Sequence, residues 1–234
     1  MFERRPAPGF LAGTLLLLVA ACSAPPRPAG EAGAPPRPAA AEGPAGSLRV
    51  VSSEVTVKVY RDGPLAELGH NHVIASTAVT GWIDLRDPLE TSAFSLSLPL
   101  DSLVVDDPGR RAAAGPDFPD NLTDADREGT RRNLLGPALL DAARFPSLRL
   151  DSVALEAAAG GYVATARVDV AGAARQVRVP ARLERTPGGL VVSGSFVLTH
   201  AELGLTPFST ALGALRVRED IEIAYRLVAS RGAS

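Results

Sequence analysis

The stretch Leu65–Asp84, with the sequence LAELGHNHVIASTAVTGWID, holds two of the three histidines and the one tryptophan of the chain. Its residues favour β-strands on both sides of Gly81, so we predict one strand that ends near Ala75 and a second that crosses the glycine. A glycine inside a strand permits a bend or a bulge, because no side chain obstructs the backbone. A strand that bends there is what a curved sheet or a closed barrel requires.

Runs of alternating apolar and polar residues recur along the chain after Leu48. This alternation is typical of antiparallel strands with one buried face, because successive side chains point to opposite sides of a strand. The apolar members of these runs are Val55, Val57, Val59, Phe94, Leu96, Leu98, Leu100, Tyr162, Ala164, Ala166, Val168, Val170, Val177, Val179, Ala181, Leu183, Leu190, Val192, Phe196, Leu198, Leu215, Val217, Ile221, Ile223, Tyr225 and Leu227. Glu219 falls on the apolar side of the last run, which places it either at a bulge or as an inward carboxylate.

The alternation stops between residues 100 and 146. Residues 101–121 are polar and rich in turn-forming pairs, which predicts a long loop. Thr123 or Asp124 can then cap a helix, which we expect to end before Pro137. The chain is thus predicted to be all-β, a single antiparallel barrel of about eight strands with a helical insertion. The interior of such a barrel holds packed side chains or one elongated ligand.

Three segments carry a resemblance to a known family. They are the histidine-bearing strand followed by Gly81-Trp82-Ile83, the segment LLGPALLDAARFPSLRLDS in the middle of the chain, and FVLTHAELGL before the last strand. Together they resemble the YceI-like family, over the range from Leu48 to Ala229. The resemblance implies a lipocalin-like antiparallel barrel, formed by residues 47–230, which binds polyisoprenoid lipids and has helices over part of one opening.

Residues 1–21 have the pattern of a signal peptide. A short basic start precedes an apolar run of about a dozen residues, which is too short to span a bilayer as a stable helix. The letters Val19-Ala20-Ala21-Cys22 resemble the lipobox of bacterial lipoproteins, in which the cysteine is diacylated and becomes the first residue. Cys22 is the one cysteine of the chain, so no disulfide can form within a single copy. A chance cysteine after an ordinary signal peptide is the alternative, and we favour the lipid anchor.

Residues 22–46 are dense in proline, alanine and glycine. Such a segment cannot bury enough apolar surface to fold, and its prolines keep it partly extended, so we predict a tether between the anchor and the barrel. Ser23 follows the cysteine where an aspartate would signal retention at the inner membrane. The expected location is therefore the bacterial cell envelope, lipid-anchored at the outer membrane with the domain in the periplasm.

The charges exclude several classes of function. The chain has 24 Lys and Arg against 26 Asp and Glu, and removal of Glu3, Arg4 and Arg5 with the signal peptide leaves 22 against 25. No basic stretch is interleaved with aromatic residues, so nucleic acid is not an expected partner. The sequence contains no P-loop, no GxGxxG and no GxSxG, and no serine has a recognisable base at a motif spacing. We therefore expect no enzymatic activity and no cofactor.

The histidines offer a metal-site hypothesis. His70 and His72 are two residues apart, so in an extended chain they point to the same side. Together with His200 they would supply three imidazoles and leave an open fourth position, as catalytic zinc requires. Nothing in the sequence brings His200 to the pair. A histidine cluster that caps the barrel mouth or hydrogen-bonds a ligand head group is the favoured interpretation.

The predicted inner faces are almost wholly aliphatic or aromatic, which favours a hydrocarbon ligand by about 0.8 kcal/mol for each CH₂ removed from water. The predicted ligand-binding residues are Phe94, Leu96, Leu98, Phe196, Leu198, Val217, Ile221 and Ile223, with His70 and His72 at the mouth beside the helical insertion. We predict non-catalytic binding of an isoprenoid, a quinone or another long-chain apolar lipid. A solid-cored module that recognises an envelope protein and a histidine-based metalloprotein are the alternatives, and a homodimer remains an open possibility for the assembly.

Overall fold

The computed structural model describes residues 42–231, so the expected signal peptide, the Cys22 anchor and most of the tether lie outside the described residues. The strands are β1 (Leu48–Asp62), β2 (His72–Ser76), β3 (Thr80–Asp84), β4 (Ala93–Pro99), β5 (Val104–Val105), β6 (Ser147–Ala158), β7 (Gly161–Val170), β8 (Ala173–Thr186), β9 (Gly189–Thr199), β10 (Ser209–Thr210) and β11 (Leu215–Ser230). The α-helices are α1 (Pro108–Ala114) and α2 (Asp124–Leu135), and the 3₁₀ turns are η1 (Ala66–Leu68), η2 (Leu89–Thr91), η3 (Leu100–Ser102) and η4 (Ala211–Gly213).

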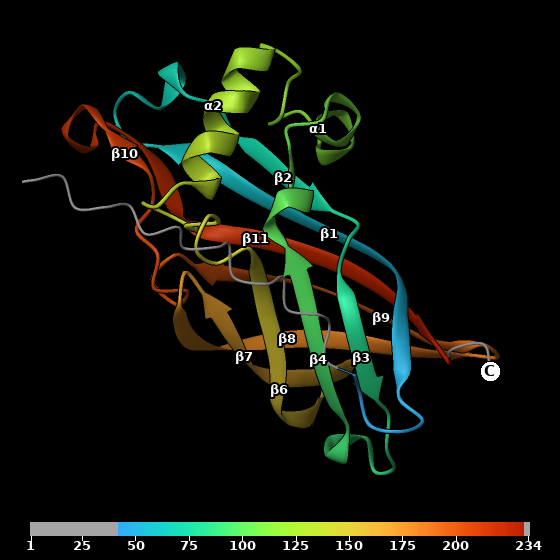
Figure 1. Ribbon diagram of the computed structural model, residues 1–234. Coiled ribbons are helices and arrows are strands. Elements are labelled where there is room, and N and C mark those ends of the chain that lie inside the picture. Colours follow the sequence, from blue (N-terminus) through green and yellow to red (C-terminus); the bar gives the residue numbers. More distant parts are fainter. Residues whose placement is uncertain (1–41, 232–234) are drawn as a thin grey trace, which may run out of the picture. The chain divides into compact units, whose positions relative to one another are not determined.

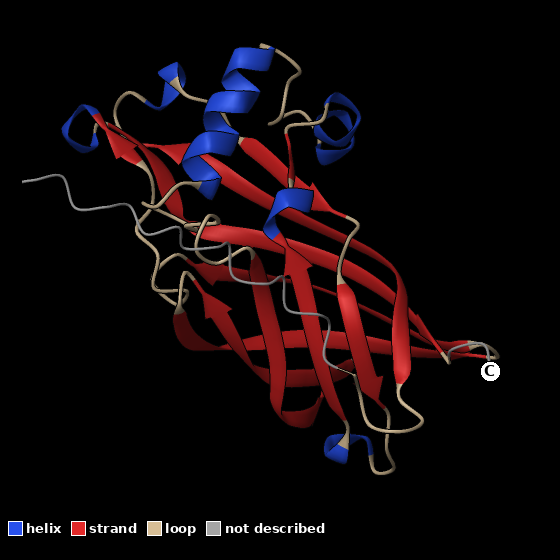
Figure 2. Cartoon of the chain, viewed as in Figure 1, coloured by secondary structure: helices blue, strands red, loops and turns tan. Residues whose placement is uncertain are grey.

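Eight of these strands close into an antiparallel barrel, as the sequence predicts (Figure 1). The circuit runs through β1, β3, β4, β6, β7, β8, β9 and β11, and β11 pairs back onto β1. The short strands β2, β5 and β10 extend the sheet from this circuit. Both α-helices lie at one end of the barrel (Figure 2). Within residues 42–231, no helix has the length and apolar character needed to cross a bilayer.

β2 and β3 behave as two halves of one interrupted strand, and Gly81 belongs to the second half. β1 pairs with β11 along one edge, and on its other edge it pairs with β3 near its start and with β2 near its end. At the interruption, the backbone N–H of Val79 donates to the hydroxyl of Ser53 over 3.0 Å, so a side chain replaces the missing ladder partner. Gly81 itself has φ +138°, a conformation that side chains disfavour. The interruption itself lies at residues 77–79, while Gly81 pairs regularly with Leu96 of β4.

Gly81→Ala is expected to lower the free energy of unfolding by more than about 1 kcal/mol, because alanine is strained at positive φ. In addition, a Cβ there would lie 2.1 Å from the carbonyl oxygen of Ser95, which belongs to the neighbouring strand β4. Urea unfolding measures the loss. Gly188→Ala is the control, since no atom lies within 4 Å of a Cβ at Gly188. Equal losses at the two positions would contradict the backbone strain and the close approach to β4 assigned to Gly81.

The segment 101–121, predicted as a long loop, contains η3, β5 and α1, so that prediction is wrong. Asp107 caps α1, since its side chain accepts a hydrogen bond from the backbone N–H of Arg110, and Pro108 occupies the first turn. An aspartate N-cap followed by proline is a known pattern at the start of a helix. The same residue types also favour turns, and for this reason the segment was predicted as a loop.

Helix α2 begins where the sequence places it. Thr123 is the N-cap and forms a capping box with Asp126, in which each side chain bonds the other residue's backbone N–H. The helix ends at Leu135, before Gly136 and Pro137. No residue of α2 is fully buried, but Leu134 and Leu135 at its end are partly buried and pack against the apolar core.

Glu219 lies at a bulge of β11. The pairing register between β1 and β11 shifts between Val59 and Arg61, where extra residues of β11 leave the ladder. The side chain of Glu219 is exposed, and its Oε1 accepts a hydrogen bond from the backbone N–H of Ala201 over 2.7 Å. The structure therefore favours the bulge over the inward carboxylate.

Candidate ligand-binding cavity

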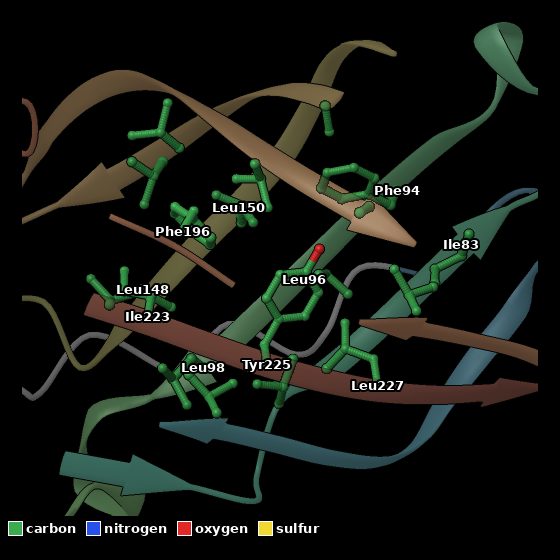
Figure 3. A pocket seen from close by; sticks show the side chains of 18 of the residues that line it. Ile83, Phe94, Leu96, Leu98, Leu148, Leu150, Phe196, Ile223, Tyr225 and Leu227 are labelled. Atoms are coloured by element: carbon green, nitrogen blue, oxygen red, sulfur yellow. The ribbon is translucent and has the colours of Figure 1, made fainter. Parts of the chain in front are cut away.

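A cavity of about 280 Å³ lies inside the barrel (Figure 3). The inner faces of all eight barrel strands contribute to its lining, and Figure 3 shows Phe94, Phe196 and Tyr225 on this inner side. Among the described residues that line it, none is charged, and the polar side chains are those of Ser92, Ser97, Tyr162 and Tyr225. The barrel is thus hollow over part of its length, and its hollow part is apolar.

Six of the eight apolar residues that we predicted to bind a ligand line this cavity, namely Phe94, Leu96, Leu98, Phe196, Leu198 and Ile223. Ile221 is buried but lies beyond the cavity, opposite Val59 of β1. Val217 also lies outside it, on the far side of the bulge at Glu219. The expected place of these two residues in the lining is corrected, because alternation within β11 does not reveal where its register shifts.

Five further residues of the lining were not predicted from the sequence. Leu148, Leu150 and Leu155 of β6 line the cavity, and so do Leu203 and Leu205 of the connector between β9 and β10. The alternation of leucine with charged residues at 148–151 was a usable signal for β6. The connector has no periodic pattern, so only its position in space reveals its role.

His70 and His72 are not among the residues that line the cavity. Partners on paired antiparallel strands share a face, so β2 can be compared with β1 rung by rung. Val55 lines the cavity, but the next rung toward His72 is Val57 opposite Ile74, and both of these pack in the apolar core. Core side chains therefore lie between the histidines and the cavity, and contact of a ligand head group with the histidines stays a prediction.

The three histidines do not form the metal site that we considered. The rings of His70 and His72 lie edge to face, with centroids 6.5 Å apart. His200 is buried in the connector after β9, where its Nδ1 lies 2.9 Å from the carbonyl oxygen of Glu219. Across residues 42–231 there is no group of three or more His, Cys, Asp or Glu side chains arranged to hold a metal ion.

His72 belongs instead to a buried ionic network that the sequence analysis missed. Asp106 and Arg111 are both 0% exposed. His72 Nδ1 lies 2.6 Å from Oδ2 of Asp106, and Arg111 Nη1 donates to Oδ1 over 2.6 Å. The backbone N–H of Val73 also donates to Oδ1, and the remaining two nitrogens of Arg111 donate to the carbonyl oxygen of Pro119. The carboxylate thus has hydrogen bonds that offset the cost of its burial.

This network joins both helices to the strands that they cover. Arg111 belongs to α1, while His72 and Val73 belong to β2. From α2, Arg127 Nε donates to the carbonyl oxygen of Asp106 over 2.9 Å, and Arg131 donates to the carbonyl oxygen of Leu103. The helical end of the barrel is therefore held by arginine contacts to the backbone together with one buried carboxylate.

The network predicts a dependence of stability on pH. Burial raises the pKa of Asp106, but the hydrogen bonds and charges of His72 and Arg111, with the N–H of Val73, outweigh burial and hold the pKa below its usual 3.8. A carboxyl with a lower pKa in the folded state stabilises the fold fully above its unfolded pKa, and this contribution is lost as the pH falls through the folded pKa. We expect the free energy of unfolding to fall below about pH 4.

Urea unfolding at a series of pH values measures this dependence, with Asp106→Asn as the reference. The variant lacks the titrating group, so its stability should change less between pH 5 and lower values. Parallel curves for the two proteins would contradict the role assigned to Asp106.

The barrel wall has a seam in which the backbone is not paired. β8 and β9 pair only near their hairpin turn, while residues 173–181 of β8 pair with β7 and residues 194–199 of β9 pair with β11. Where the strands separate, the hydroxyl of Tyr225 donates to the carbonyl oxygen of Pro180 over 2.9 Å. Gly194 leaves room for this contact, because a Cβ there would lie 2.2 Å from the same oxygen. A side-chain hydrogen bond thus closes the narrow end of the seam.

The connector between β9 and β10 closes the wider part of the seam. Gly204 packs against the guanidinium of Arg175 on β8, where a Cβ would lie 2.3 Å from a guanidinium nitrogen. On either side of this glycine, Leu203 and Leu205 line the cavity. The connector therefore forms part of the cavity wall where β8 and β9 are unpaired.

A closed eight-stranded antiparallel barrel with an apolar cavity and helices at one end defines the class of lipocalin-like barrels. The model of the YceI-like domain matches residues 50–229. The chain therefore belongs to the YceI-like family, as its sequence motifs indicated.

A solved structure supports the fold. BcnA of Burkholderia cenocepacia is similar with a TM-score of 0.55 and 14% sequence identity, and the match covers 76% of this chain and 96% of that one. The YceI protein of Campylobacter jejuni has a TM-score of 0.45 and 11% identity, over 67% of this chain and 82% of that one. No curated protein matches the chain in sequence. At these identities the likeness to BcnA concerns the fold alone.

Proposed function

We propose that the barrel binds a long-chain apolar lipid, such as an isoprenoid or a polyprenyl quinone, without altering it chemically. The observation that carries this proposal is the cavity of about 280 Å³ with no charged side chain among its described lining residues. An apolar chain placed there gains about 0.8 kcal/mol for each CH₂ removed from water. Polyisoprenoid lipids are also the ligands that the YceI-like family implies.

The chemistry of the lining favours binding over catalysis. The polar side chains that reach the cavity are two serines and two tyrosines. Burial raises the pKa of Tyr225 well above its usual value, so its hydroxyl stays protonated and donates to Pro180. No described residue of the lining is a histidine or a carboxylate that would act as a general base.

The proposal places the barrel at the bacterial outer membrane, on the periplasmic side, anchored through a diacylated Cys22. The lipobox-like letters Val19-Ala20-Ala21-Cys22 and the absence of aspartate at position 23 support this location. Mass spectrometry of the protein from the membrane fraction is expected to find an acylated Cys22 as its first residue. An unmodified N-terminus or an uncleaved Met1 would contradict the anchor.

Solvent extraction of the natively purified protein, followed by lipid mass spectrometry, tests the binding function. We expect one class of apolar lipid at close to one molecule per protein, beyond the acyl chains attached at Cys22. The extracted protein should then take up an added polyprenyl quinone. If no hydrophobic ligand copurifies and none can be loaded, the barrel is better described as a module that recognises another envelope protein.

A further inference from the structure

The turn between β10 and β11 carries a leucine in an unusual position. Leu212 has φ +56° and ψ +33°, the left-handed conformation that glycine, asparagine and aspartate adopt more readily. Its side chain is fully exposed, with a relative exposure of 109%. Within the described chain the leucine therefore gains nothing from packing that would offset its backbone strain. Strained residues that persist at exposed positions point to a function.

A neighbouring loop adds further exposed apolar side chains. The backbone N–H of Leu65 donates to the carbonyl oxygen of Ala214 over 2.8 Å, which holds the loop around η1 against the turn at η4. Leu65 is 40% exposed and Leu68 is 71% exposed, and Phe208, which leads into β10, is 47% exposed. Both loops project beyond the end of the β1 and β11 ribbon (Figure 1). We name Leu65, Leu68, Phe208 and Leu212 the apolar tip.

The surroundings of the apolar tip are free of unpaired charge in the described residues. Residues 203–215, LGLTPFSTALGAL, contain no charged side chain, although 21% of the chain is charged. Glu67 stands between Leu65 and Leu68 and is 89% exposed, but it pairs with Arg61 over 3.1 Å. Asp62 pairs with Arg216 over 2.7 Å. An apolar phase can therefore approach the tip without removing water from an isolated charge.

We propose that the apolar tip inserts into the interfacial region of a lipid bilayer. Leucine and phenylalanine side chains that stand on two separate loops suit a fluid apolar phase, which fills the space between them. Protein partners more commonly meet a packed patch anchored by tryptophan, tyrosine or arginine, and none of these belongs to the tip. Exposed apolar clusters of this kind mark membrane or protein contacts rather than ordinary surface.

The tip is also within reach of the membrane that the lipid anchor implies. The tip lies at the far end of β1 from Leu48, and the 15 residues of β1 span about 50 Å. Residues 42–46 are described, and Gly43 packs against the ring of Trp82, so they do not belong to the free part of the tether. If residues 23–41 are extended as expected, they would reach about 60 Å at about 3.1 Å per residue. The chain is therefore long enough for the barrel to turn its tip toward the bilayer that holds Cys22.

The same uncharged segment joins the tip to the cavity wall. Leu203 and Leu205 line the cavity, and Phe208 follows three residues later at the surface. Docking of the tip would bring this part of the wall to the membrane surface. The inference does not depend on the proposed ligand, because the tip can dock whether or not the cavity is occupied.

Tryptophan fluorescence of the intact, lipid-anchored protein tests the inference. Leu212→Trp is introduced in a Trp82→Phe background, and the protein is placed in vesicles of phosphatidylethanolamine and phosphatidylglycerol, with or without brominated acyl chains. We expect blue-shifted emission that brominated lipid quenches about twofold or more, because the side chain reaches the boundary of head groups and acyl chains. Leu68→Trp, on the other loop, should give the same result.

Val153→Trp in the same background is the matched control, since Val153 is 56% exposed on β6 and does not belong to the tip. Its emission should resemble that of tryptophan in water and should not respond to brominated lipid. Equal quenching at Val153 and at both tip positions would overturn the proposal. A blue shift at the tip without quenching would also overturn it, since a second copy or a protein partner would produce that result. Lipid extraction from the same samples reports separately on the cavity.

Discussion

Asp106→Asn is expected to lower the free energy of unfolding by about 3–5 kcal/mol, because it leaves a buried arginine without its anion. Arg111 is 0% exposed and its Nη1 lies 2.6 Å from the carboxylate, so water cannot replace the lost partner. The substitution also removes the acceptor of His72. Urea unfolding monitored by circular dichroism near neutral pH measures the difference.

Asp62→Asn is the matched control for this prediction. Asp62 pairs with Arg216 over 2.7 Å, but the two side chains are 41% and 46% exposed, so the loss should be below about 1 kcal/mol. A double variant, Asp106→Leu with Arg111→Met, removes both buried charges and should be more stable than Asp106→Asn alone. A cost at Asp106 no larger than that at Asp62 would show that the network does not hold the helical end.

Ile223→Asp and Leu98→Asp are each expected to abolish retention of the lipid. Both side chains line the cavity, where an introduced carboxylate would have no cationic partner among the described lining residues. A carboxylate in such a place either draws water into the cavity or becomes protonated, and both outcomes weaken the binding of a hydrocarbon chain. The ratio of extracted lipid to protein measures the loss.

Substitutions on the outer face separate this effect from general destabilisation. Ala224 follows Ile223 in β11 and is exposed, and Arg226 is exposed two residues later, so Ala224→Asp and Arg226→Asp should retain the lipid. Ala164→Phe fills part of the cavity without adding charge and should also reduce retention. If the aspartate variants fold and still hold lipid at the wild-type ratio, the ligand does not occupy this cavity.

The barrel could be predicted because its strands carry a local signal. Alternation of apolar and polar residues marks a half-buried strand without reference to its partner. The capping residues of α2 are equally local, since Thr123 and Asp126 lie in one turn. Pairing is not local, so the period left the bulge at Glu219 as one of two alternatives and did not reveal the seam between β8 and β9.

At the candidate site, too, local patterns could be predicted, whereas contacts between residues distant in the sequence could not. Six cavity residues could be predicted from the strand faces, while Leu203 and Leu205 required the path of the connector. The network of Asp106 was invisible for a related reason, since His72 and Asp106 are 34 positions apart. In the sequence, Asp106 and Arg111 belong to a polar run that resembles a solvated turn. Asp106 and Arg111 are buried because α1 packs over β2. The sequence around them gives no signal of this packing.

The barrel wall can deform more easily at the seam between β8 and β9 than elsewhere. Residues 173–181 and 194–199 share no ladder hydrogen bond, so the circumference can lengthen there without the rupture of main-chain pairing. The bond between Tyr225 and Pro180 and the packing of the connector are what resist this expansion. The volume of about 280 Å³ therefore describes the cavity at rest. The circumference of such a barrel can change, whereas the apolar chemistry of its lining cannot. The barrel therefore discriminates between ligands by polarity more strictly than by width.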